Sequence, residues 1–98
     1  MSELRLMFVD IFKQSLVDEE HDDWGHQYIF RFPNNYGASV IRNSASYGNS
    51  QDLWEMALIF FDEDGDWDLT YERDFDDDVI GYLTDDNVIE LLEKIKQY

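Results

Sequence analysis

Residues 53–79 read LWEMALIFFDEDGDWDLTYERDFDDDV, and this stretch decides the fold. The Asp-Gly pair at 64–65 separates two segments of alternating polarity and is typical of a two-residue type I′ turn, whose central positions both need positive φ. The pattern predicts an antiparallel hairpin whose apolar side chains share one face, because side chains alternate between the faces of a strand. The predicted pairs are Phe60 with Leu69, Leu58 with Tyr71, Met56 with Arg73, and Trp54 with Phe75.

Two more strands are expected before this hairpin. Aromatic residues occupy every second position of 27–32, and the turn-forming sequence Pro-Asn-Asn-Tyr-Gly follows at 33–37. This order predicts a second hairpin that continues into a strand at 38–43. The segment 43–52 is small and polar, which is typical of a long loop.

Helices are expected at both ends of the chain. Residues 3–17 carry apolar side chains at helical spacing, and an acidic loop at 18–25 ends this helix, because carboxylates are unfavourable at a helix C-terminus. Thr84 is a favourable N-cap for a second helix. The expected apolar positions are Leu4, Met7, Phe8 and Ile11 in the first helix and Val88, Leu91, Leu92 and Ile95 in the second.

These elements predict an α+β fold with the order α-β-β-β-β-α. In this fold a four-stranded antiparallel sheet carries the N-terminal and the C-terminal helix on one face. With 98 residues, of which 44% are hydrophobic, the chain is expected to form a single compact domain that spans 1–98.

Charge and composition exclude several classes of function. The chain has 7 Lys and Arg residues against 23 Asp and Glu residues, a net charge of −16. Direct binding to nucleic acid or to an anionic membrane is disfavoured, because phosphate contacts need cations. The absence of Cys excludes disulfides and zinc–sulfur sites. No signal-peptide pattern or membrane-length apolar run occurs, so a cytoplasmic protein is expected.

Acidic residues occupy almost every second position of segment 66–78. In an extended chain they would share one face at intervals of about 6.8 Å, of the same order as the spacing of about 3.4 Å between phosphates along a DNA strand. We therefore expect this face to mimic phosphates. The alternative is a solvated face or a charge-protected edge strand, although such surfaces usually mix both signs. The expected partner-binding residues are Asp64, Asp66, Asp68, Glu72, Asp74, Asp76, Asp78 and the loop residue Tyr47.

Other kinds of site fit the sequence less well. An EF-hand loop needs a ligand five residues before its glycine, and counting back from Gly65 reaches Phe60. His21 and His26 lie beside acidic residues, but their spacing fits no common helical metal site and no third ligand is marked. Among so many carboxylates, none is singled out for catalysis by an apolar pocket. The sequence therefore predicts no catalytic, metal or cofactor site, with adventitious calcium binding as an alternative.

Several short segments resemble a family of small proteins encoded by phages and prophages. They are YGASVIR at 36–42, SYG at 46–48, LWEMA at 53–57, LTY at 69–71 and DDVIGYLT at 77–84, before a leucine-rich last helix. The resemblance covers roughly residues 36–95 and implies a phage origin, but no established biochemical role comes with it. The chain departs from the family pattern in its acidic hairpin at 61–68 and at Asp76, where its charge is densest.

The acidic face and the resemblance together lead to an expected function. The chain is expected to be a non-enzymatic phage inhibitor that occludes a nucleic-acid-binding host protein, such as a restriction nuclease, an RNA-guided CRISPR nuclease or a repair enzyme, in the host cytoplasm. The alternative is a structural or regulatory phage protein that assembles through a sheet edge and loops, with apolar anchors such as Tyr47, Trp54 or nearby apolar residues. The salt dependence of partner binding distinguishes the two functions, because salt screens charges and leaves apolar contacts largely intact.

Overall fold

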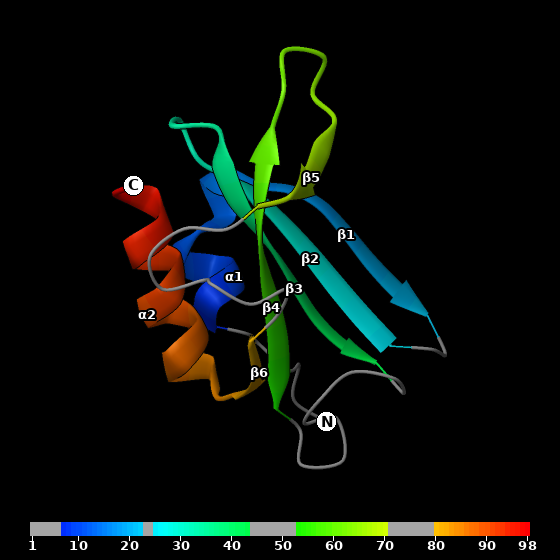
Figure 1. The fold of residues 1–98 in the computed structure, drawn as a ribbon. Helices are drawn as coiled ribbons and strands as arrows, with labels where there is room; N and C mark the ends of the chain where they lie inside the picture. The colour runs from blue at the N-terminus through cyan, green and yellow to red at the C-terminus, as the bar shows by residue number, and fades with distance from the viewer. Residues whose placement is uncertain (1–6, 23–24, 44–52, 71–79) are drawn as a thin grey trace.

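A computed structural model describes residues 7–22, 25–43, 53–70 and 80–98 (Figure 1). The elements are α1 (Met7–Ile11), the 3-10 turn η1 (Lys13–Ser15), β1 (Leu16–Asp22), β2 (Gly25–Arg31), β3 (Tyr36–Asn43), β4 (Trp54–Phe61), β5 (Trp67–Leu69), β6 (Ile80–Leu83) and α2 (Asp85–Lys96). The strands form one antiparallel sheet in the order β1-β2-β3-β4-β5, and β6 pairs with β4. The predicted α+β class is confirmed, but the described residues form six strands instead of four.

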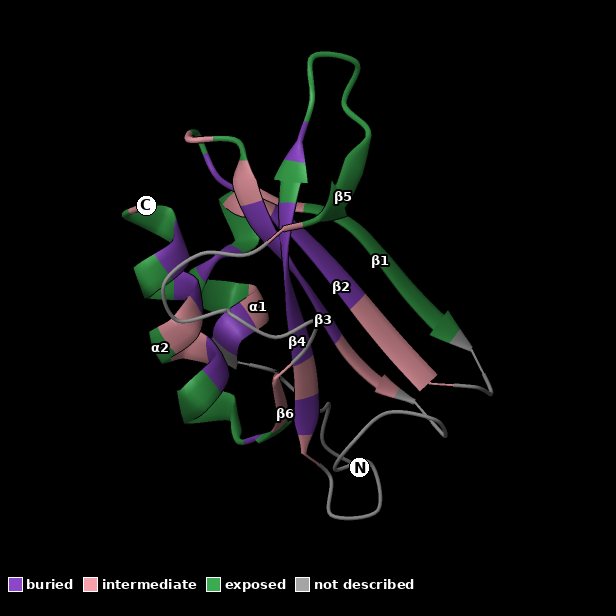
Figure 2. Ribbon diagram, viewed as in Figure 1, coloured by how far each residue is buried: buried purple, intermediate pink, exposed green. Residues whose placement is uncertain are grey.

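The main core combines side chains of both helices with one face of the sheet (Figure 2). Trp54 lies within this core, and its indole N–H donates a 2.8 Å hydrogen bond to Oδ1 of Asp85 at the start of α2. This bond ties β4 to the helix. The buried residues of the core are Phe8, Phe12, Tyr28, Phe30, Phe32, Ala38, Val40, Trp54, Met56, Leu58, Leu83, Val88, Leu92 and Ile95. None of the described helices is both long and apolar enough to span a bilayer.

The start of α2 agrees with the sequence prediction. The Thr84 hydroxyl accepts a hydrogen bond from the Asn87 backbone N–H, and the Thr84 backbone N–H donates to Oδ1 of Asn87, both at 3.1 Å. These two bonds form a capping box, which satisfies backbone donors at the first turn. The predicted inward positions Val88, Leu92 and Ile95 are buried.

Substitution of Thr84 by alanine is expected to lower the free energy of unfolding by about 1 kcal/mol, because the Asn87 N–H loses its acceptor. Urea denaturation followed by circular dichroism measures the change. Thr84→Ser keeps the hydroxyl and should remain close to the original protein. Equal losses for the two variants would show that the capping hydroxyl contributes nothing.

The first helix ends earlier than predicted, and of its expected inward positions Phe8 is buried but Ile11 is not. α1 ends at Ile11, and after η1 the chain enters β1 at Leu16. Phe8 and Phe12 both pack edge-on against Phe30, whereas Ile11, which was predicted to face inward, is exposed. Leu16 pairs with Phe30 in the sheet, so the chain must be extended there. Sheet pairing overrides the weak local preference for a longer helix.

The acidic loop predicted at 18–25 is wrong for residues 18–22, which belong to β1. This strand pairs antiparallel with β2 and forms an edge of the sheet. Asp18, Glu19 and Glu20 are exposed there. Their charges remain solvated, so the low strand preference of acidic residues costs little here. Charge on an edge strand also discourages pairing with another chain.

The Asp-Gly pair at 64–65 turns the chain between β4 and β5, but not as the predicted two-residue turn. Within the fully described turn, positive φ occurs only at Gly65, at 85°. The backbone N–H of Asp62 donates to the carbonyl of Asp66 at 2.9 Å. Oδ1 of Asp62 accepts the N–H groups of Asp64 and Asp66 at 2.9 and 3.1 Å. These contacts close a three-residue loop, in which only the last residue needs positive φ.

The longer loop shifts the register of the hairpin by one residue. Phe60 pairs with Asp68 instead of Leu69, and Leu69 pairs with Ile59. The predicted pairing is therefore wrong. Because paired residues share a face, Asp68 lies on the face of Phe60, while Trp67 and Leu69 lie on the opposite face.

The unpredicted strand β6 occupies the edge of β4 that was expected to pair with residues 73–75. Trp54 pairs with Leu83 and Met56 pairs with Ile80, so the partners predicted for Trp54 and Met56 are wrong. Leu83 is buried in the core directly before the α2 cap, which explains why this segment occupies the edge. The predicted Leu58–Tyr71 pair involves a residue outside the described part of the chain.

Candidate cation-binding pocket on the acidic hairpin

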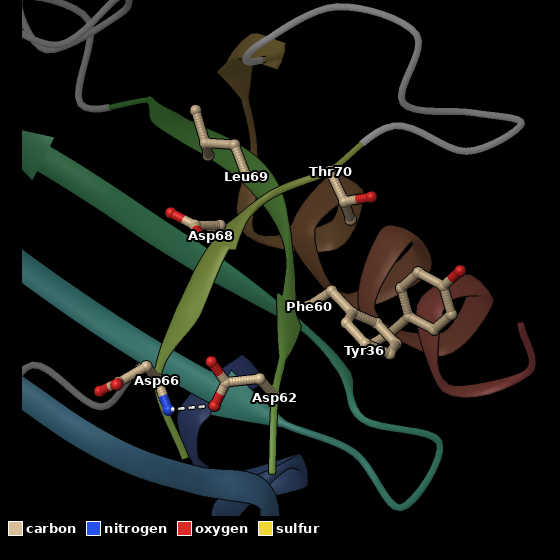
Figure 3. Close-up of a pocket in the computed structure, with 7 residues that line it drawn as sticks. All are labelled: Tyr36, Phe60, Asp62, Asp66, Asp68, Leu69 and Thr70. Atoms are coloured by element: carbon tan, nitrogen blue, oxygen red, sulfur yellow. Dashed lines mark hydrogen bonds between the residues drawn. The ribbon is translucent and has the colours of Figure 1, made fainter. Parts of the chain in front are cut away.

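A surface pocket of about 380 Å³ lies beside the β4–β5 hairpin, next to the start of β3 (Figure 3). Carboxylates and aromatic rings both line it, which combines negative charge with flat apolar surface. Its lining residues are Tyr36, Phe60, Asp62, Asp66, Asp68, Leu69 and Thr70.

The aromatic part of the pocket is held by ring contacts. Tyr36 and Phe60 meet edge to face with ring centres 5.0 Å apart, and Tyr98 packs on Tyr36 at 5.5 Å. Asn34 supports this arrangement, because its Oδ1 accepts the Tyr36 N–H at 3.0 Å and its Nδ2 donates to the Ile95 carbonyl at 2.9 Å. The rings of Tyr36 and Phe60 lie together on the α2 side of the hairpin in Figure 3. Since Phe60 is exposed, this surface is accessible to a partner.

The acidic part of the pocket comes from both arms of the hairpin. Asp62 follows β4, Asp66 precedes β5 and Asp68 lies within β5. All three are exposed. Asp62 is fixed by its two bonds to backbone N–H groups, one of which is drawn in Figure 3. None of the described Lys, Arg or His residues forms an ion pair with these three carboxylates.

The structure brings together only part of the predicted partner-binding set. Asp66 and Asp68 line the pocket, and Asp64 lies at the exposed tip of the turn outside it. The other predicted site residues lie outside the described part of the chain, namely Tyr47, Glu72, Asp74, Asp76 and Asp78.

Asp62 and Phe60 were not predicted as site residues. The position of Asp62, three residues before the turn glycine, is a sequence signal for its role in the turn. An Asp side chain there can accept hydrogen bonds from the backbone N–H groups of the turn. Phe60 gave no such signal, since the predicted register placed it in the apolar face. In the structure it pairs with Asp68 and is exposed.

The combination of carboxylates and aromatic rings suits an arginine side chain. Guanidinium forms bidentate hydrogen bonds with carboxylates and stacks on aromatic faces, and both contacts strengthen when water is excluded. Lysine can make the ionic contact but lacks the planar fork. The pocket therefore fits a basic side chain presented by a partner.

A second exposed feature lies on the opposite face of the hairpin. Trp67 and Leu69 are exposed there, on the face that carries the small buried cluster of Ile29, Ile59 and Phe61. Trp67 lies outside the pocket, whereas Leu69 also lines it.

No protein-family model, curated protein or solved structure matches this chain. The resemblance to phage-encoded proteins therefore stays a prediction.

Proposed function

We propose that this chain is a non-enzymatic, phage-type inhibitor that acts in the cytoplasm of a host cell. Its acidic hairpin binds a basic, nucleic-acid-binding surface of a host protein, such as a defence nuclease or a repair enzyme. Nucleic acid is then excluded because the carboxylates contact the Lys and Arg side chains that otherwise bind phosphates.

One observation carries this proposal: Asp62, Asp66 and Asp68 line one pocket with no ion pair to any described cation. Neighbouring like charges repel one another and destabilise the compact state. A basic partner relieves this repulsion. The aromatic surface of Tyr36 and Phe60 beside the carboxylates favours arginine within that partner.

The net charge of −16 supports the association step. Charge complementarity steers two proteins together and raises the association rate, while the close contacts in the pocket determine how long the complex lasts. A basic groove that holds phosphates attracts such a protein for the same reason that it attracts DNA or RNA.

Neutralisation of the pocket in the triple variant D62N/D66N/D68N is expected to reduce partner capture about tenfold or more at low salt. Asn keeps an oxygen acceptor at position 62, so the turn is preserved. The tagged protein is used for affinity capture from a bacterial lysate, and bound proteins are identified by mass spectrometry. A nucleic-acid-binding protein should be captured at about 0.05 M salt, released at about 0.5 M salt and displaced by added DNA or RNA.

The matched control is D18N/E90Q/E93Q, which neutralises exposed carboxylates outside the pocket. Removing three negative charges from −16 leaves −13 in both variants. A difference in capture between them therefore reports the position of the charges and not the net charge. The control should retain capture. Equal capture by both triple variants would overturn the proposed role of the pocket.

A second candidate function is assembly with another phage protein through the apolar side of β5. The exposure of Trp67 and Leu69 favours it. In that case W67A, which removes a side chain outside the pocket, would abolish capture, and D62N/D66N/D68N would retain it. The complex would also survive high salt, because apolar contacts are little screened.

A further inference from the structure

Two histidines lie directly opposite each other near the end of the β1–β2 hairpin. His21 and His26 are ladder partners, and their ring centres are 5.0 Å apart. Nδ1 of His21 lies 2.8 Å from Nδ1 of His26. This end of the hairpin projects away from the helices in Figure 1. The pair is therefore outside the acidic pocket of the β4–β5 hairpin.

Glu19 orients the first of these rings. Its Oε1 lies 2.8 Å from Nε2 of His21. A carboxylate only accepts hydrogen bonds, so Nε2 of His21 carries the proton of this contact. In the neutral ring, Nδ1 of His21 then has its lone pair free to accept the Nδ1–H of His26. When a metal binds both Nδ1 atoms, that proton moves to Nε2 of His26 or is released to water. A carboxylate behind a ligating histidine is a common support of metal sites.

The spacing of the two nitrogens is close to the requirement of a metal ion. Two nitrogens bound tetrahedrally to zinc at about 2.05 Å lie about 3.3 Å apart. The observed separation of Nδ1 atoms is 2.8 Å, so the rings need to open by only about 0.5 Å to admit the ion. His21 and Glu19 are exposed, which leaves room for this movement.

We propose that His21 and His26 bind a divalent transition-metal ion of the zinc class through their Nδ1 atoms, with Glu19 holding His21 from behind. Imidazole nitrogen selects zinc, copper or nickel over calcium and magnesium, which prefer oxygen. The described residues contain no group of three or more His, Cys, Asp or Glu side chains placed around one metal position. The remaining coordination positions thus belong to water or to an exchangeable ligand.

The charged neighbours of the pair define its electrostatics. Arg42 is the ladder partner of His26 on β3, and its guanidinium carbon lies 4.4 Å from the Trp54 ring centre. This cation opposes metal binding, and Glu19 and the net charge of −16 favour it. Burial, followed by the charge of Glu19, raises the pKa of Tyr28, whereas Arg42 lowers it.

Titration of the full chain with zinc chloride, followed by NMR of the imidazole nitrogens, tests this site. Excess Mg²⁺ is present throughout to occupy the oxygen-rich carboxylate clusters. We expect one Zn²⁺ per chain and shifts at Nδ1 of both His21 and His26. Glu19→Gln should weaken binding roughly tenfold or more, and His21→Gln and His26→Gln should weaken it further.

Glu20→Gln is the matched control. Glu20 is exposed and adjacent to Glu19, but it pairs with Gln27. Because side chains alternate along a strand, Glu20 lies on the face opposite to Glu19 and His21. It should bind Zn²⁺ as the original protein does. Circular dichroism checks that each variant is folded, and the two His variants provide independent tests. Unchanged zinc affinity in either folded His variant, or equal affinity in Glu19→Gln and Glu20→Gln, would overturn the proposed site.

Discussion

Replacement of Trp54 by alanine is expected to lower the free energy of unfolding by about 3–5 kcal/mol. The side chain is fully buried and meets the rings of Phe8 and Tyr28 with centres 5.1 and 5.8 Å apart. Its removal leaves a cavity, and Asp85 loses the indole N–H that ties β4 to α2. Urea denaturation followed by far-ultraviolet circular dichroism measures the loss.

Trp67→Ala provides the matched control. Trp67 is 38% exposed on the short edge strand β5, and its substitution should change the free energy of unfolding by about 0.5 kcal/mol or less. Similar losses for the two tryptophans would contradict the described core. The burial of Trp54 also corrects the expectation that it could be an apolar anchor for a partner, because a fully buried ring presents no surface for binding.

Replacement of Gly37 by alanine is expected to cost about 3 kcal/mol. Gly37 was predicted to belong to a turn, but it lies in β3. A Cβ atom at this position would lie 1.9 Å from the carbonyl oxygen of Phe30 and 3.0 Å from the ring of Phe61. Because the nearer atom belongs to the backbone of β2, the two strands must move apart and strain their hydrogen bonds. Thermal and urea unfolding both report this loss.

Gly65→Ala separates this crowding from a purely conformational effect. Gly65 has φ at 85°, but a Cβ atom there would have no neighbour within 4 Å. The expected cost is about 1 kcal/mol, from the positive φ alone. If Gly65→Ala were as destabilising as Gly37→Ala, close approach of the strands would not explain the requirement for glycine at 37.

Elements with strong local signals were predicted well. The α2 cap at Thr84 and the buried positions Val88, Leu92 and Ile95 depend on residues within one helix, and the structure confirms them. The antiparallel pairing of β2 with β3 is also confirmed. It follows from alternating aromatic residues and a short turn. In both cases the interacting residues are close in sequence.

Elements that depend on distant contacts were predicted less well. β1 was missed because its acidic residues have low strand preference, and pairing with β2 outweighs that preference at a solvated edge. β6 was missed because its place depends on burying Leu83 beside α2. The register of the β4–β5 hairpin failed because the Asp62 side chain closes a loop one residue longer than predicted.

The candidate sites show the same division. Asp66 and Asp68 were predicted as binding residues from alternation alone, and they line the pocket. Their neighbours Tyr36 and Phe60 come from other strands and were brought there by folding. The sequence spacing of His21 and His26 fits no common helical metal site, yet the β1–β2 ladder places them opposite each other.

The sequence by itself determined the α+β class, the capped last helix, the position of the acidic hairpin and its excess of negative charge. These properties depend on composition and on contacts between near neighbours, which a linear pattern contains. Only the tertiary structure decided the edge strands, the hairpin register, the aromatic side of the pocket and the pairing of the histidines. Those features arise when pairing and burial between distant segments outweigh local preference, and that balance depends on the whole fold.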